Sequence, residues 1–133
     1  MSQVLSENAK RLLREPVLAH IATVDARGRP RISPVWVDID GDDVLFNTAE
    51  GRVKARNLHA NSNVAVSVVD PTDPHRVVAL TGTVTEMTHD GADEHIDFLA
   101  NKYLGVEAFG DRRPGQQRVK VRIRPDLIAM QPE

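Results

Sequence analysis

The chain of 133 residues contains no cysteine, which excludes disulfide bonds, thiolate catalysis and cysteine-ligated metal sites. It also lacks any apolar run approaching the roughly 20 residues that cross a bilayer. The N-terminal stretch MSQVLSENAKRLLREP has no apolar centre of the kind found in signal peptides. The formal net charge is −2, so no surplus of positive charge attracts nucleic acid or an anionic membrane. We therefore expect a cytoplasmic protein that binds neither nucleic acid nor membranes.

Several catalytic signatures are absent as well. Neither GxGxxG nor GxxxxGK occurs, which argues against a Rossmann or P-loop nucleotide site. No serine lies in a GxSxG motif, and HExxH does not occur. The five histidines show no spacing typical of metal ligands, so no metal site is expected. Nothing in the sequence indicates a hydrolase.

The hydrophobic patterns predict a single domain over residues 1–133, with a fold that is mainly β (α+β). Apolar residues at helical spacing predict a helix at about 4–14, ended by Pro16. About six strands follow in a barrel region at about 17–130, over residues 17–24, 31–39, 44–48, 64–70, 76–87 and 118–130. Further helices are expected at 52–60 and 90–105, the latter with Asp90 as its N-cap. Because closing antiparallel strands removes sheet edges, we predict a small barrel.

The segment NTAEGRVKARNL, residues 47–58, concentrates positive charge where a helix is expected to begin. Arg52, Lys54 and Arg56 lie within five positions, and Glu50 is the only acid nearby. A helix N-terminus carries partial positive charge and free N–H groups, so these cations oppose the local dipole. A bound phosphate would use the free N–H groups and neutralise the cations. The residues alone leave two interpretations open, an anion site and a solvated helix face.

The segment ISPVWV, residues 32–37, is the second unusual stretch. Pro34 has no N–H to donate, which predicts an edge strand or a bulge here. Such irregularity leaves backbone groups free to bond a planar ligand. Trp36, the only tryptophan, is either a wall of that pocket or an ordinary packing residue.

These stretches together resemble a known family. HIATVDARGRPRISPVW, VLFNTAEGRVKARNL, KYLG, a loop containing PG, and RVKVRIRP occur in the order found in the pyridoxamine 5′-phosphate oxidase-like split β-barrel proteins, which have an FMN-binding-like fold. Within that family the chain is most similar to the short actinobacterial branch that uses the deazaflavin coenzyme F420. The resemblance implies a homodimer of split barrels with a cofactor site at each subunit interface.

The resemblance also implies which residues hold the cofactor. It assigns the cofactor phosphate to Arg52 and Lys54, with Thr48 and either Arg56 or Asn57 nearby. It assigns the planar ring to the segment Ser33, Pro34, Val35 and Trp36. Pyridoxamine phosphate oxidases proper are longer and carry a substrate-phosphate segment at the C-terminus, whereas this sequence ends at MQPE. Vitamin B6 oxidase activity is therefore not expected.

The function implied is a reductase that passes a hydride from reduced F420 to a small organic acceptor. No catalytic side chain is assigned, because solvent can supply the proton; His75 and Tyr103 are the alternatives. Arg112 and Arg113 belong to loop 106–117, which either binds the acidic F420 tail or is simply solvated. Two other classes remain open: an FMN oxidoreductase, and a non-catalytic binder of cofactor or haem in which His20 would be the axial ligand.

Overall fold

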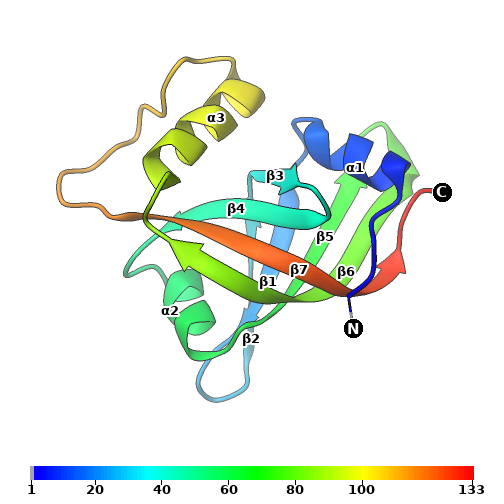
Figure 1. Ribbon diagram of the computed structural model, residues 1–133, viewed down its shortest axis with the longest axis horizontal. Helices are drawn as coiled ribbons and strands as arrows, with labels where there is room; N and C mark the ends of the chain where they lie inside the picture. The colour runs from blue at the N-terminus through cyan, green and yellow to red at the C-terminus, as the bar shows by residue number, and fades with distance from the viewer. Residues whose placement is uncertain (1) are drawn as a thin grey trace.

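The computed structural model describes residues 2–133, and over this range one curled antiparallel sheet of seven strands forms the body of the molecule (Figure 1). The order of strands across the sheet is β2-β1-β5-β6-β7-β4-β3. The strands are β1 (Ala19–Val24), β2 (Pro30–Val35), β3 (Val37–Asp40), β4 (Asp43–Ala49), β5 (Asn63–Asp70), β6 (Asp73–Thr88) and β7 (Arg118–Met130). All of the strand pairs are antiparallel, as expected from the sequence.

The sequence predicted one strand over residues 31–39, and this was wrong. The chain leaves strand geometry at Trp36, so the stretch forms β2 at one edge of the sheet and β3 at the other. Pro34 accordingly lies in an edge strand, where its missing N–H costs no ladder bond. Because two consecutive strands occupy opposite edges, the connection at Trp36 requires the sheet to curl back on itself.

Three helices accompany the sheet: α1 (Glu7–Arg14), α2 (Val53–Ala60) and α3 (Ala92–Leu104). Ser6 caps α1 by accepting a hydrogen bond from the N–H of Ala9. Asp90 is not the N-cap of α3, contrary to the sequence prediction. Gly91 occupies that position with a φ of 73°, a left-handed conformation that glycine adopts without the strain a Cβ would bring.

The core lies inside the curl of the sheet, and α1 closes one end of it. The face of α1 that the sequence predicted to be apolar is buried, with Leu12 and Leu13 fully inaccessible. These side chains pack with inward-facing strand residues such as Ile21, Phe46 and Val121. In Figure 1, α2 and α3 lie towards the left of the view and α1 towards the right, and the last turn of α3 reaches back to α1, where Lys102 donates to the carbonyl of Leu13.

The longest strands, β6 and β7, pack closely where the sheet bends. A Cβ on Gly82 would lie 2.4 Å from the carbonyl oxygen of Arg124, so only glycine permits this approach. The register between the two strands shifts close by, between Thr81 and Gly82. The close packing of β6 on β7 at this point therefore requires a residue without a side chain.

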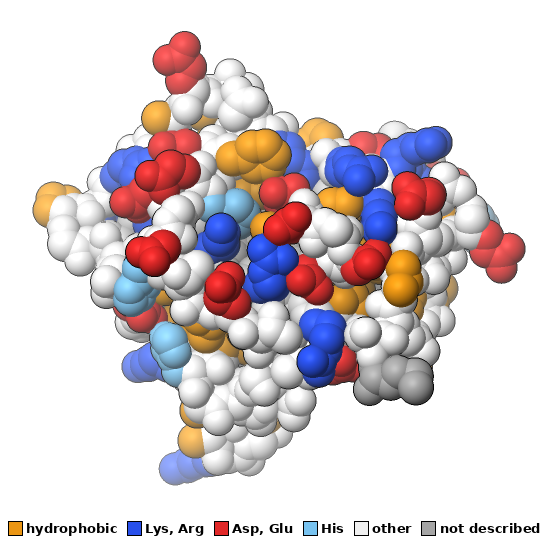
Figure 2. Space-filling model, viewed as in Figure 1, with side chains coloured by type: hydrophobic (Ala, Val, Ile, Leu, Met, Phe, Trp, Pro, Cys, Tyr) orange, Lys and Arg blue, Asp and Glu red, His pale blue; other side chains and the backbone are white. Residues whose placement is uncertain are grey.

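Charged side chains of both signs are interspersed over the face drawn in Figure 2. Arg122 on β7, for example, pairs with Asp40, Asp43 and Glu86. The charge of Arg122 is therefore compensated locally. Among the described residues 2–133, no helix is long and apolar enough to cross a membrane.

Candidate functional site

A cavity of about 230 Å³ lies between the end of β2, the start of α2 and one face of α3. We call it the α2 cavity. One end is polar and the other is apolar. The polar lining is Asn47, Thr48, Arg52, Lys54 and Arg118, and the apolar lining is Leu18, Pro34, Val35, Trp36, Ile96, Leu99 and Phe109.

The positive charge predicted from the sequence lies at the polar end. Gly51, with a φ of 88°, turns the chain from β4 into α2, and Arg52 is the residue that precedes the first turn. No side chain caps the helix and its first turn contains no acid. Within residues 2–133, neither Arg52 nor Lys54 forms an ion pair, because Glu50 bonds His59 and His89 instead. Burial lowers the pKa of Lys54, and Arg52 and Arg118 lower it further.

Two buried polar atoms of this cavity have no hydrogen-bond partner in the described part of the chain. One is Oγ1 of Thr48, whose side chain is 1% exposed, and the other is Nη1 of Arg118, which is 6% exposed. Leaving such a group unpaired costs about 1–3 kcal/mol, and more when it is charged. These groups therefore suit a ligand that brings acceptor atoms into the cavity.

The apolar end is built from stacked aromatic rings. The rings of Trp36 and Tyr103 are stacked, with centroids 5.2 Å apart and an angle of 13° between their planes. Phe109 meets Trp36 edge-on at 6.1 Å. Trp36 is thus both a pocket wall and a packing residue, the two roles between which the sequence could not choose. A flat apolar surface beside a cluster of cations suits a planar ligand with an anionic group.

Helix α3 holds the Trp36 wall in place through the backbone of the next residue. The Tyr103 hydroxyl accepts from the N–H of Val37 at 3.0 Å and donates to the carbonyl of Val17 at 2.6 Å. Lys102 donates to the carbonyls of Leu13 and Val37, each at 2.6 Å. Burial lowers the pKa of Lys102 to about 8. At the break between β2 and β3, the backbone N–H and carbonyl of Val37 therefore bond side chains of α3.

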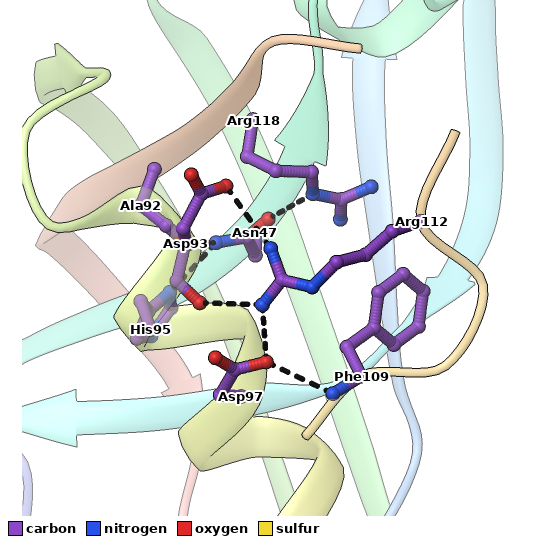
Figure 3. A network of polar contacts seen from close by, with 8 residues as sticks. All are labelled: Asn47, Ala92, Asp93, His95, Asp97, Phe109, Arg112 and Arg118. Atoms are coloured by element: carbon purple, nitrogen blue, oxygen red, sulfur yellow. Dashed lines mark hydrogen bonds and ion pairs between the residues drawn. The ribbon is translucent and has the colours of Figure 1, made fainter. Parts of the chain in front are cut away.

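A buried polar network lies behind the cavity (Figure 3). Nε of Arg118 donates to Oδ1 of Asn47 at 2.8 Å. Nδ2 of Asn47 lies 2.9 Å from the carbonyl of Ala92 and 3.1 Å from Nδ1 of His95. Burial, with a smaller contribution from Lys120, lowers the pKa of His95 to about 4. The sequence analysis missed Arg118, Asn47 and His95, because they come from three elements far apart along the chain.

The loop after α3 folds back onto that helix. Asp97 accepts a hydrogen bond from the N–H of Phe109 at 2.9 Å and forms an ion pair with Arg112. Arg112 also pairs with Asp93 at 3.5 Å. The nearest acid to Arg113 is its neighbour Asp111, at 3.9 Å. Arg112 is thus already engaged by acids of α3, so binding an acidic tail would require it to exchange partners.

Of the residues that the sequence predicted to bind the cofactor, some line the α2 cavity and others lie elsewhere. Pro34, Val35, Trp36, Thr48, Arg52 and Lys54 line the α2 cavity together. Ser33 lines an adjoining space of about 430 Å³, which shares Arg52 and Lys54 as lining residues. Arg56 is exposed and lines neither space. Asn57 is buried and donates to Oγ1 of Thr23, so it joins α2 to β1.

Histidines considered for other roles lie away from the α2 cavity. His20 is exposed on the outer face of the sheet, where an axial ligand would not reach this space. His75 is exposed near the start of β6. The Tyr103 hydroxyl is already bonded on both sides, and burial raises its pKa. Among residues 2–133, no three histidine or acidic side chains are grouped so as to hold a metal ion.

Comparison with known proteins agrees with the resemblance seen in the sequence. A sequence model described as pyridoxamine 5′-phosphate oxidase matches residues 5–131. A solved structure described as an F420 reductase shares 30% identity, covers 94% of this chain and 98% of its own, and superposes with a TM-score of 0.82. The comparison with curated protein sequences gave no match.

More distant structures share the fold alone. HupZ from Group A Streptococcus is 20% identical, with a TM-score of 0.70, covering 94% of this chain and 92% of its own. A protein from Lactobacillus delbrueckii described as a putative pyridoxamine 5′-phosphate oxidase is 19% identical, with a TM-score of 0.68, covering 98% and 100%. The split-barrel fold expected from the sequence is confirmed, with seven strands in the curled sheet rather than about six.

Proposed function

The chain belongs to the pyridoxamine 5′-phosphate oxidase family, and on this premise we propose that it is a reductase that uses coenzyme F420. In this role it binds the reduced deazaflavin and passes a hydride to a small organic acceptor. The similarity that supports F420 most directly is the 30% identity to the F420 reductase, which extends over nearly the whole of both chains.

The α2 cavity has the chemistry that this cofactor needs. Arg52, Lys54 and the start of α2 supply positive charge for the phosphate, and the unpaired Thr48 hydroxyl supplies a donor. Pro34, Val35 and Trp36 supply a flat apolar side for the ring. The observation that carries the proposal is this pairing of uncompensated cations with an aromatic wall in one space.

The protein's own contribution is positioning. Bound F420 supplies the hydride chemistry, as organic cofactors do. Arg52 and Lys54 fix the phosphate end, and Trp36, held through Val37 by α3, fixes the ring plane. Precise orientation of ring and acceptor lowers the entropic cost of the reaction. Tyr103 is withdrawn from proton transfer by its two backbone bonds, so solvent supplies the proton.

FMN is the second candidate cofactor. The family model that matches the chain is described as pyridoxamine 5′-phosphate oxidase, and proteins of this family typically bind FMN. FMN also joins a planar ring to a phosphate. The cations of the α2 cavity would accept its phosphomonoester as readily as the phosphodiester of F420. The residues that line the α2 cavity therefore support a cofactor with a planar ring and a phosphate, and the 30% identical reductase favours F420 over FMN.

A paired titration distinguishes the two cofactors. Purified apo-protein is titrated with F420 and, separately, with FMN, and cofactor fluorescence reports binding. Tight F420 binding with weak FMN binding is the expected result. The reverse order of affinities would reassign the protein to FMN chemistry. Failure to bind either would contradict the proposed function altogether.

We also propose that the outer face of the sheet joins a second copy of the chain. Strand alternation that buries Ile21 turns His20 and Ala22 outward, beside an apolar hollow of about 270 Å³. Ile32 on β2 is 71% exposed there and Leu127 on β7 is 55% exposed. Apolar surface of this kind favours association. A homodimer would bring a second protomer to the β2 edge, close to the α2 cavity.

A further inference from the structure

Arg118 is a buried cation that faces the α2 cavity without a matching negative charge. Its side chain is 6% exposed, and its Nη1 has no partner within residues 2–133. Burial lowers its pKa, and repulsion from Arg52 and then Arg112 lowers it further. The acids Asp93 and Asp111 act in the opposite direction with less effect. Burying a cation under these conditions is costly unless something else compensates it.

The network behind Arg118 fixes the direction in which its guanidinium can point. An arginine only donates, so Asn47 must turn its carbonyl oxygen to Nε of Arg118. The amide of Asn47 then faces the carbonyl of Ala92, which only accepts. It also faces Nδ1 of His95, which must therefore be unprotonated. The low pKa of His95 agrees with this neutral form.

Packing accounts for only part of this arrangement. The guanidinium of Arg118 lies 5.3 Å from the centre of the Phe109 ring, a cation–π contact. That contact and the bond to Asn47 leave Nη1 unused and the charge unneutralised. Arg112 differs, because Asp93 and Asp97 already pair with it. Arg112 is therefore paired with acids, whereas Arg118 forms no ion pair within residues 2–133.

We propose that Arg118 is a further anion-binding residue, which joins Arg52 and Lys54 around the phosphoryl group of the ligand. Asn47 and His95 act as positioning residues that aim the guanidinium into the cavity. The three cations then surround one anion, whose negative charge offsets the repulsion that they exert on one another when no ligand is bound. The inference rests on the proposed function for the identity of the ligand, but not for the presence of an anion site.

The test replaces Arg118 with Met and compares a matched loss of charge on the same strand. Arg122→Met removes an arginine that faces Asp40, Asp43 and Glu86 and does not line the α2 cavity. Affinities for inorganic phosphate, FMN and F420 are measured by calorimetry. Arg118→Met should lower the affinity for each ligand that binds by about 10- to 100-fold, while Arg122→Met changes it less than about twofold. Equal affinities in wild type and Arg118→Met would overturn the proposal.

A second variant keeps the proposal testable if Arg118→Met does not fold. Arg118→Gln removes the positive charge but keeps an N–H that can donate to Oδ1 of Asn47. Phosphate affinity should fall about 10-fold in this variant. An arginine that only packs would leave the affinity unchanged.

The outcomes separate this inference from the proposed function. Phosphate binding that depends on Arg118, without binding of F420 or FMN, supports the inference and contradicts the reductase. Cofactor binding that is indifferent to Arg118 supports the reductase and overturns the inference. Absence of binding for all three ligands in the wild type overturns both.

Discussion

At the start of α2, Arg52 and Lys54 present two positive charges that no acid neutralises within residues 2–133. Replacing either with Ala should remove one charge-assisted contact to the cofactor phosphate. Such a contact is worth about 1.5–3 kcal/mol, so each variant should bind cofactor about 10- to 100-fold more weakly while remaining folded. Fluorescence titration with F420 measures the loss.

Arg56 provides the comparison on the same helix. It is exposed and does not line the α2 cavity, so Arg56→Ala should change the affinity less than about twofold. A large effect from Arg56 together with none from Arg52 would mean that the anion binds elsewhere on α2.

His95 gives a prediction about pH at the same scale. Its pKa falls from 6.5 to about 4 because the folded protein buries it in the neutral form. Between these values the unfolded chain binds more protons than the folded chain, so acid favours unfolding. The free energy of unfolding should therefore fall by up to about 3 kcal/mol from pH 6.5 to pH 4 on account of this residue. Below that window the contribution is constant.

Urea denaturation across the same pH range measures this contribution. His95→Gln lacks the titrating group, so its stability should depend less on pH than that of the wild type. The difference between the two proteins should shrink or reverse as the pH falls. Parallel curves for the two proteins would show that His95 is not held neutral.

At the scale of elements, the contact between α3 and the β2–β3 break determines where the Trp36 wall lies. Tyr103→Phe removes the hydroxyl that bonds the backbone of Val17 and Val37. Unpaired backbone groups should cost about 1–3 kcal/mol of unfolding free energy. Trp36 is the only tryptophan, so its fluorescence spectrum should change as the wall loosens. An unchanged spectrum and stability would mean that the Tyr103 hydroxyl is not needed to hold Trp36.

The elements also show how far sequence patterns reach. The strand at 118–130 and the buried face of α1 follow from local alternation and helical spacing, and both are confirmed. The break at Trp36 was missed because residues 31–39 read as one continuous strand. At this break the N–H of Val37 donates to the hydroxyl of Tyr103 instead of to a strand, and Tyr103 comes from a helix much later in the chain. Long-range contacts of this kind leave no periodic signal.

Some residues of the candidate site were likewise predicted from local sequence patterns, and others were missed. Lys54 and its neighbours were found because cations at a helix start contradict a local rule. Trp36 was found because it follows a proline in a strand. Arg118 gave no such signal, since an arginine that begins an alternating strand is unremarkable in sequence. Only the curl of the sheet, which pairs it with Ala49 beside Thr48, brings it to the cavity.

For the whole molecule, the exposed apolar face predicts association. Ile32→Asp places a charge on that face, on the edge strand β2, without touching the core, because Ile32 is 71% exposed. The wild type should elute as a dimer in chromatography with light scattering, and the variant should be shifted towards the monomer. A wild type that is monomeric at all concentrations would contradict the proposed dimer. A far-UV circular dichroism spectrum like that of the wild type would confirm that the variant folds.

The central claim is that the α2 cavity is the cofactor site. The most direct measurement is a crystal structure of the protein with F420 bound. We predict the phosphate in contact with Arg52, Lys54 and the Thr48 hydroxyl, and the deazaflavin ring against Pro34, Val35 and Trp36. A cofactor located on the outer face of the sheet, or with its phosphate away from the start of α2, would contradict the central claim.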